Sequence, residues 1–189
     1  MNELEKKLLL TKDEYTFLLD RFRNNSSIVK QINYYFDDEK LSMNSQNITC
    51  RIRLKDGKYK GTMKKHTSTD RSTENKIKVR DGIYNNAFID MGLKLQGELI
   101  TERCIILKDS SCEVALDKNE YLDHIDYEME IEYAPSHEKA AQSILQNFFD
   151  ILMRRNGLLS YSSSCTQTPH VPSKSNRFFK VKAAIDSKS

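Results

Sequence analysis

Acidic side chains occupy every second position in one stretch of the chain. Glu128, Glu130 and Glu132 alternate there with aromatic or apolar residues. In a β-strand, residues two apart point to the same side and lie about 6.8 Å from each other. Three carboxylates in such a row repel one another unless a cation or bulk water lies between them. The row therefore predicts either a solvated surface or a site for hard metal cations, which prefer oxygen ligands.

Basic side chains alternate in the same way in other stretches, where they suit phosphate oxygens. Arg51, Arg53 and Lys55 share one face of a stretch whose other face carries Ile52 and Leu54. Arginine offers a planar fork of donors that matches phosphate, and lysine a compact positive charge. Three further rows are Glu3 with Glu5 and Lys7, Thr62 with Lys64, and Thr101 with Arg103.

Two helices and a series of strands must position these rows. Thr11 and Glu14 have the spacing of a capping box, and helical periodicity follows over 12–23. A second helix is predicted from Ser136 to a stop at Gly157, and a short one near 84–91. A last short strand is expected over 174–181. The period of two predicts strands over 3–10, 30–37, 48–55, 58–65, 72–79, 98–107, 111–117 and 126–133.

The short connections between these strands predict an antiparallel sheet. Asp56-Gly57 is a strong hairpin signal, and eight strands leave exposed edges unless the sheet closes. The expected fold class is therefore α+β: an eight-stranded antiparallel closed β-barrel, or tunnel, with covering α-helices. We expect one domain over 1–182 and a flexible tail over 183–189.

Solvated outer faces are the alternative interpretation of the charged rows. That reading explains any single strand well, but it explains five strands together less well. The opposite faces are apolar and need a cover, which the two helices can provide. Only the bore of the barrel then remains for the charges, so the sequence predicts a cavity that holds an anionic ligand with its metal ions.

Charge and composition exclude several classes of protein. The 189 residues carry 30 Lys and Arg against 27 Asp and Glu, a net charge of +3, whereas nucleic-acid binders usually show a dominant basic excess. No apolar run reaches the roughly 20 residues of a membrane helix, and the acidic start lacks a secretory signal. The four separated cysteines then predict reduced thiols. We expect a cytoplasmic monomer or homodimer with no nucleic-acid and no membrane partner.

Short motifs follow one another between about residue 2 and residue 180. They are Glu3-Leu4-Glu5-Lys6-Lys7, Tyr34-Tyr35-Phe36-Asp37, Arg51-Ile52-Arg53, Thr62-Met63-Lys64, Glu74, Thr101-Glu102-Arg103, 113–117, 126–132 and Lys174-Ser175-Asn176-Arg177-Phe178. Together they resemble the CYTH superfamily, also called triphosphate tunnel metalloenzymes, and most of all its YjbK-like bacterial branch. The chain departs from the pattern at Lys65-His66, where the family often has a proline turn, and at Lys76 and Lys78, where a second acid often occurs.

The resemblance implies an eight-stranded tunnel and metal-dependent chemistry on triphosphates with Mg²⁺ or Mn²⁺. It implies metal ligands at Glu3, Glu5, Glu128 and Glu130, with Glu74, Glu113 and Asp117 holding a second metal or orienting basic residues. It implies substrate-binding residues at Lys7, Arg51, Arg53, Lys64, Arg103, Lys174 and Arg177, with Lys55 and Lys78 as weaker candidates. Catalytic roles are expected for Glu5, Lys7, Glu130 and Glu132.

Three functions are compatible with the sequence. The first is a metal-dependent triphosphatase in which water attacks a terminal phosphoryl group, with inorganic triphosphate as the expected substrate. The second is a class IV type adenylate cyclase that makes cyclic AMP from ATP, although no base-reading pattern is present. The third is a non-catalytic binder of polyphosphate or nucleotides. His66, His124, His137 and His170 match no catalytic pattern and are expected on the surface.

Overall fold

The computed structural model describes residues 2–23, 26–68, 71–156 and 171–188. Its helical elements are α1 (Lys12–Phe22), α2 (Ser42–Ser45), α3 (Ala87–Asp90), the 3-10 turn η1 (Pro135–His137), α4 (Glu138–Arg155) and α5 (Lys174–Asp186). Its strands are β1 (Asn2–Leu10), β2 (Ile28–Asp37), β3 (Ile48–Lys55), β4 (Lys58–Ser68), β5 (Arg71–Ile77), β6 (Val79–Asp81), β7 (Asn85–Asn86), β8 (Lys94–Lys108), β9 (Cys112–Tyr121) and β10 (His124–Tyr133).

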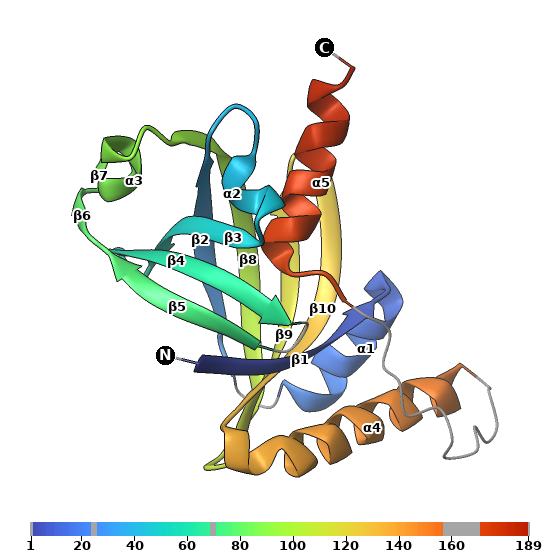
Figure 1. The fold of residues 1–189 in the computed structure, drawn as a ribbon. Helices are drawn as coiled ribbons and strands as arrows, with labels where there is room; N and C mark the ends of the chain where they lie inside the picture. Colours follow the sequence, from blue (N-terminus) through green and yellow to red (C-terminus); the bar gives the residue numbers. More distant parts are fainter. Residues whose placement is uncertain (1, 24–25, 69–70, 157–170, 189) are drawn as a thin grey trace.

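Eight of these strands form an antiparallel barrel in the order β1-β10-β9-β8-β2-β3-β4-β5 (Figure 1). The predicted α+β barrel fold is thereby confirmed. Its seams are unequal: β1 pairs with β10 over seven residues, but with β5 only over Asn2–Leu4. The barrel closure is therefore weakest between β1 and β5, where few backbone hydrogen bonds join the two edge strands of the sheet.

Tight turns fix the register of the hairpins. Asp56 and Gly57 both have positive φ, 50° and 70°, as a two-residue turn between twisted strands requires. Leu122 and Asp123 turn the same way between β9 and β10, with φ of 46° and 60°, although leucine is not a typical residue for that conformation. The first hairpin is therefore encoded locally, whereas the second depends on the pairing of its strands.

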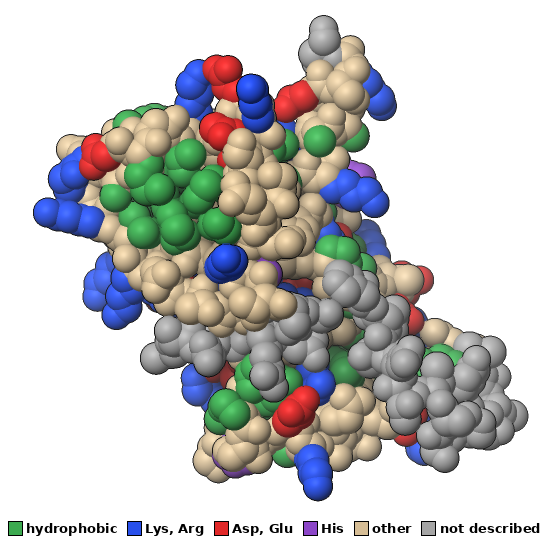
Figure 2. Space-filling model, viewed as in Figure 1, with side chains coloured by type: hydrophobic (Ala, Val, Ile, Leu, Met, Phe, Trp, Pro, Cys, Tyr) green, Lys and Arg blue, Asp and Glu red, His purple; other side chains and the backbone are tan. Residues whose placement is uncertain are grey.

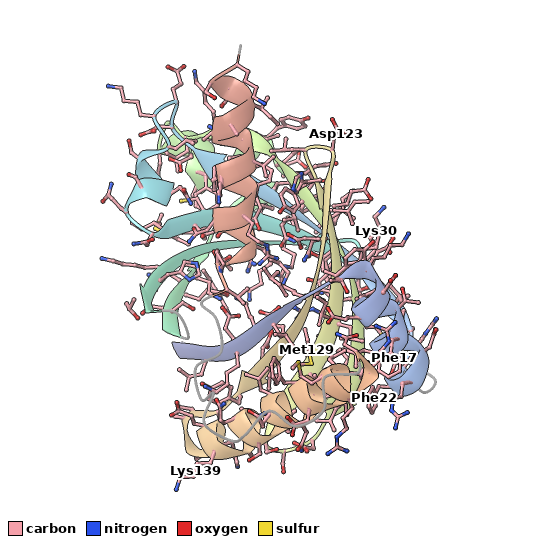
Figure 3. All side chains as sticks on the ribbon, turned by 90° about the vertical axis from the view of Figure 1, so that its right-hand side faces the viewer. Phe17, Phe22, Lys30, Asp123, Met129 and Lys139 are labelled. Atoms are coloured by element: carbon pink, nitrogen blue, oxygen red, sulfur yellow. The ribbon has the colours of Figure 1, made fainter. Side chains whose placement is uncertain are left out.

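The apolar side of the barrel wall faces outward, against two helices. Met129 and Ile131 of β10 pack in one cluster with Leu18 of α1 and with Leu145 and Leu152 of α4. Figure 3 shows Met129 directed toward α4, beside Phe17 and Phe22 of α1. Since the helices cover the outer faces of these strands, their alternate, charged side chains point into the bore.

A second apolar cluster covers the wall formed by β2 and β3. Phe36 and Ile52 are buried there against Phe88 of α3, and Asn86 caps α3 by accepting from the Phe88 amide at 2.9 Å. The short helix predicted near 84–91 is present as α3 over Ala87–Asp90, preceded by the short strand β7. Figure 2 shows hydrophobic side chains gathered on this side of the molecule.

The prediction of a strand over 174–181 is wrong, because this segment forms α5. Ser173 has extended backbone geometry and its hydroxyl accepts from the Asn176 amide at 3.2 Å, which is an N-cap. Phe178 and Phe179 are buried from this helix against side chains of the barrel strands. The helix continues through Asp186, beyond the expected domain limit at residue 182.

Helix α5 fills one end of the barrel. Phe178 and Phe179 are buried against the inward-facing Tyr35, Leu99 and Tyr121. The backbone of β8 comes close at Gly97, where a Cβ atom would lie 2.9 Å from the Phe178 ring. The bore is therefore blocked by aromatic side chains at the α5 end. None of the described helices is long and apolar enough to cross a membrane.

Candidate functional site

The charged rows meet in a cavity of about 150 Å³ inside the barrel. Both Arg53 and Glu130 line it, so the expectation that the rows share an interior is confirmed. The lining residues are Glu5, Lys7, Tyr35, Thr49, Arg51, Arg53, Lys60, Lys64, His66, Glu74, Arg103, Glu130, Glu132, Ser173, Lys174 and Ser175.

One wall of the site is a set of converging carboxylates. Asp117 of β9 lies opposite Glu128 of β10 in the strand register, and Glu130 follows on the same face. All three are buried, and each offers an oxygen within 4.8 Å of the others. Opposite oxygens of an octahedral Mg²⁺ site lie about 4.2 Å apart, so these three carboxylates fit a hard divalent cation after small side-chain movements.

Basic groups from two distant elements neutralise this wall. Arg103 of β8 binds Asp117 through two parallel bonds, Nε to Oδ1 at 2.9 Å and Nη2 to Oδ2 at 2.7 Å. The ammonium of Lys174, from α5, lies 2.9 Å from Asp117 and 2.8 Å from Glu130, and it also contacts Glu128. A cation thus already lies among the three carboxylates, which is the position that a metal ion would take.

Glu5 and Glu130 form a carboxyl pair on β1 and β10. Burial and the neighbouring Glu130 charge raise the pKa of Glu5. Burial would also raise the pKa of Glu130, but Lys174, Arg103 and Lys7 outweigh it and hold this pKa well below its ordinary value. Of the two carboxyl groups, Glu130 is therefore the one that ionises more readily.

Lys7 completes this part of the site. Its register places it opposite Glu130, and its ammonium lies 2.7 Å from Glu5 and 3.9 Å from Glu130. Burial lowers the pKa of Lys7, yet the carboxylates of Glu130 and Glu5 raise it on balance. The residue is a fixed cation between the acidic wall and the cavity.

The opposite wall, from β3 and β4, is mainly cationic. Arg51 lies 3.7 Å from Glu74, and Lys60 lies 3.0 Å from the same carboxylate. Lys64 lies 3.7 Å from Glu5 across the bore. Arg53 donates from Nε to the amide oxygen of Asn33 at 2.9 Å. This wall presents more positive than negative groups to the cavity, as an anion-binding surface requires.

Four predicted site residues with described side chains are absent from the cavity lining: Glu113, Asp117, Glu128 and Arg177. Arg177 is bound to Asp126 and Glu128. Glu113 pairs with Lys108 near the rim of the barrel, and Glu74 lies on the cationic wall, so these two acids do not meet Asp117. Glu132 lines the cavity at its edge, with 52% of its side chain exposed, and contacts Arg103. The side chain of Glu3 lies outside the described residues, as do Cys165 and His170.

Sequence reasoning missed several lining residues. His66 was expected on the surface, but it is half-buried in the cavity wall, 3.4 Å from the Thr49 hydroxyl. Thr49 also contacts Ser175 of α5 at 2.7 Å. A signal existed for Thr49 and His66, because they extend the alternate rows of Arg51 and Lys64; Ser175 gave none, because α5 was predicted as a strand. Lys55 and Lys78, the weaker candidates, are exposed.

Asp126 anchors α5 to the barrel through a network at its buried end. Burial would raise its pKa, but hydrogen bonds from Arg177, Asn119 and Tyr121 lower it on balance. A lowered folded-state pKa adds stability above the ordinary value of 3.8, and this stability is lost as the pH falls through the folded value.

Asp126→Asn is therefore expected to be less stable than the wild type by about 1–3 kcal/mol near pH 7. The difference should shrink as the pH falls below about 4, toward and through the lowered pKa of the folded wild type, because the carboxylate becomes protonated there. Urea unfolding at pH 7, 5, 4 and 3 measures both free energies. An equally large difference at pH 3 and pH 7 would show that the Asp126 charge does not stabilise the fold.

Comparison with known proteins identifies relatives of this chain. Residues 1–157 match the family model of the CYTH domain. The chain is similar to "Putative triphosphatase YjbK" of Bacillus subtilis (strain 168), with 27% identity over 164 residues that cover 77% of this chain and 86% of that protein. The family match ends before α5, so Lys174 and Arg177 lie outside it.

Solved structures share the fold at low sequence identity. A crystal structure named as a putative adenylate cyclase of Bacillus halodurans has a TM-score of 0.63 and 21% identity, with 94% of this chain and 97% of that chain covered. A Hippeastrum protein, named as a putative adenylyl cyclase and described as having a dominant triphosphatase activity, has a TM-score of 0.61 and 17% identity, with 95% of both chains covered. At these identities the likeness concerns the fold alone.

Proposed function

This chain belongs to the CYTH domain family, and from that premise we propose that it is a metal-dependent hydrolase of triphosphates that prefers inorganic triphosphate. The observation that carries the proposal is the division of one small cavity into two walls. The cationic wall around Arg51 and Arg53 suits phosphate oxygens. The carboxylate cluster of Asp117, Glu128 and Glu130, of which Glu130 lines the cavity, suits a hard cation.

The size of the cavity supports the choice of substrate. Its volume of about 150 Å³ is below the roughly 300–1,000 Å³ of pockets that enclose drug-sized ligands. Phe178 and Phe179 block the α5 end, so a nucleoside attached to the phosphates would have to remain outside the bore. A bare phosphate chain gains the full set of cationic contacts without that constraint.

In the proposed reaction, water attacks a terminal phosphorus and the bond to the leaving diphosphate breaks. Phosphoryl transfer depends mainly on positioning and on neutralising the non-bridging oxygens, roles that we assign to Arg51, Arg53, Lys64 and Arg103. Lys7 and Lys174 add positive charge at the boundary with the acidic wall. A bound divalent metal supplies further charge neutralisation and makes bound water more acidic. Asp117, Glu128 and Glu130 would hold it.

The two members of the carboxyl pair suit different roles. Glu130, whose pKa is held low, suits a permanently ionised metal ligand. The pKa of Glu5 is raised toward neutral pH. Glu5 therefore suits the acceptance of a proton from the attacking water. Glu132, at the edge of the cavity, is the alternative acceptor. A cytoplasmic location, a monomeric or homodimeric state and the absence of nucleic-acid and membrane partners remain predictions.

A hydrolysis panel tests this proposal. Inorganic triphosphate, ATP, thiamine triphosphate and long polyphosphate are each incubated with Mg²⁺ or Mn²⁺, and phosphate release is measured beside cyclic AMP. We expect inorganic triphosphate to give the highest kcat/KM, and EDTA to abolish turnover. Cyclic AMP from ATP as the main product would identify a cyclase instead, and tight triphosphate binding without turnover would identify a binding protein.

A further inference from the structure

Arg53 differs from the other cationic side chains of the cavity in its hydrogen-bonding partner, which is neutral. Arg53 lines the cavity, but it forms no ion pair with any carboxylate in the parts of the chain that the structure describes. Its Nε donates instead to the neutral amide oxygen of Asn33, at 2.9 Å. Each of the other six is paired with a carboxylate: Lys7, Arg51, Lys60, Lys64, Arg103 and Lys174.

Asn33 is itself fixed in the barrel wall. The residue is 1% exposed and lies opposite Arg53 in the pairing of β2 with β3. On the other side, β2 pairs with β8, and the Asn33 Nδ2 donates to the Leu99 carbonyl at 3.4 Å. The amide thus joins three neighbouring strands, and its oxygen faces Arg53 in a defined direction.

The neutral partner matters because of the charges around Arg53. Burial, together with the positive charges of Arg51 and Arg103, lowers the pKa of Arg53 to about 10. The guanidinium is still protonated near neutral pH, but the protein balances its charge poorly. A phosphate group in the cavity supplies the missing negative charge, so the electrostatic gain on binding is larger at Arg53 than at a cation already paired with a carboxylate.

We propose that Asn33 is a positioning residue for triphosphate binding, which fixes the Arg53 guanidinium through Nε and leaves its positive charge unpaired for a phosphate group. This inference rests on the proposed function. Aspartate at the same position would make the same hydrogen bond but neutralise the arginine. We therefore infer that position 33 requires asparagine because its side chain accepts the hydrogen bond from Arg53 without adding a negative charge.

Asn33→Asp separates this role from a purely structural one. The variant keeps an acceptor for Arg53 Nε but loses the Nδ2 donor to the Leu99 carbonyl, so we expect a lower thermal midpoint and measure binding well below it. Because the new carboxylate competes with phosphate, we expect the Kd for inorganic triphosphate in metal-free buffer to rise about tenfold or more, which corresponds to about 1.4 kcal/mol. Isothermal titration calorimetry measures this Kd without turnover, and KM should rise in parallel.

A double-mutant cycle tests whether Asn33 acts through Arg53. Asn33→Leu should raise the Kd in the wild-type background but have no further effect in the Arg53→Ala background. Asn86→Leu is the matched control, because Asn86 is an equally buried asparagine that caps α3 outside the bore. This control should lose stability and keep wild-type triphosphate affinity.

The outcomes distinguish this inference from the proposed function. Wild-type affinity in Asn33→Asp, or an equal effect of Asn33→Leu with and without Arg53, would overturn the positioning role while triphosphate hydrolysis by the wild type still stands. If the wild type neither binds nor hydrolyses triphosphate, the proposed function fails and this inference fails with it.

Discussion

Glu130→Gln is expected to lower kcat for metal-dependent triphosphate hydrolysis by about 10²–10³-fold, the range found when one preorganised electrostatic group is removed from an active site. Glu130 is the carboxylate at which the two halves of the site meet. Arg103 and Lys174 contact its Oε2 and Lys7 lies near its Oε1. The substitution keeps the shape of the side chain but removes one of three converging anionic ligands, so both metal affinity and the alignment of the basic groups should decline.

The measurement is phosphate release at saturating triphosphate over a range of Mg²⁺ or Mn²⁺ concentrations. Circular dichroism should show a folded barrel, because Asp117 and Glu128 still balance the buried cations. Glu102→Gln is the matched control: Glu102 lies on β8, pairs with Lys118 at 3.3 Å and is absent from the cavity lining. Wild-type kcat in both Glu130→Gln and Glu5→Gln would remove this pair from the active site.

Lys174→Met is expected to lower the free energy of unfolding in metal-free buffer by about 3–5 kcal/mol, the cost of removing one partner from a buried ion cluster. The ammonium of Lys174 lies among Asp117, Glu128 and Glu130. Without it, these carboxylates lose their central cation and repel one another. A divalent cation that binds the folded state should then stabilise the variant by mass action.

Urea unfolding in EDTA, and again with Mn²⁺, measures both effects. We expect the increase in stability on adding Mn²⁺ to be larger for Lys174→Met than for the wild type, because the lysine no longer occupies the centre of the cluster. Lys182→Met is the control on the same helix, since Lys182 pairs at 2.9 Å with the exposed Asp186, a contact worth about 0.3–0.5 kcal/mol. Equal losses in the two variants, or an equal response to Mn²⁺, would contradict the central role of Lys174.

Helix α5 therefore serves the site in two ways. Phe178 and Phe179 close one end of the bore by apolar packing, and Lys174, one turn earlier, carries its charge to the acidic wall. Arg177 ties the helix to Asp126 and Glu128. Since the four α5 residues Lys174, Arg177, Phe178 and Phe179 follow the segment that matches the CYTH domain model, the helix that closes this end of the bore lies beyond that match.

The sequence by itself determined which residues share a face. A period of two is a local property of an extended chain, so the rows containing Arg51, Arg53, Glu128 and Glu130 follow from spacing alone. The capping box at Thr11 and Glu14 and the turn at Asp56-Gly57 are local for the same reason, and the structure has both. These signals predicted the eight barrel strands and the two long covering helices.

Only the tertiary structure decided which charges meet. Strand pairing across the barrel places Lys7 opposite Glu130 and Arg103 opposite Asp117, contacts between segments that no local pattern connects. The 174–181 segment reads as a strand from its own residues, but burial of two aromatic rings in the barrel mouth makes it a helix and brings Lys174 to the carboxylates. Propensity is a weak local preference, whereas the burial of side chains by distant parts of the chain is a larger free-energy term and selects the final arrangement.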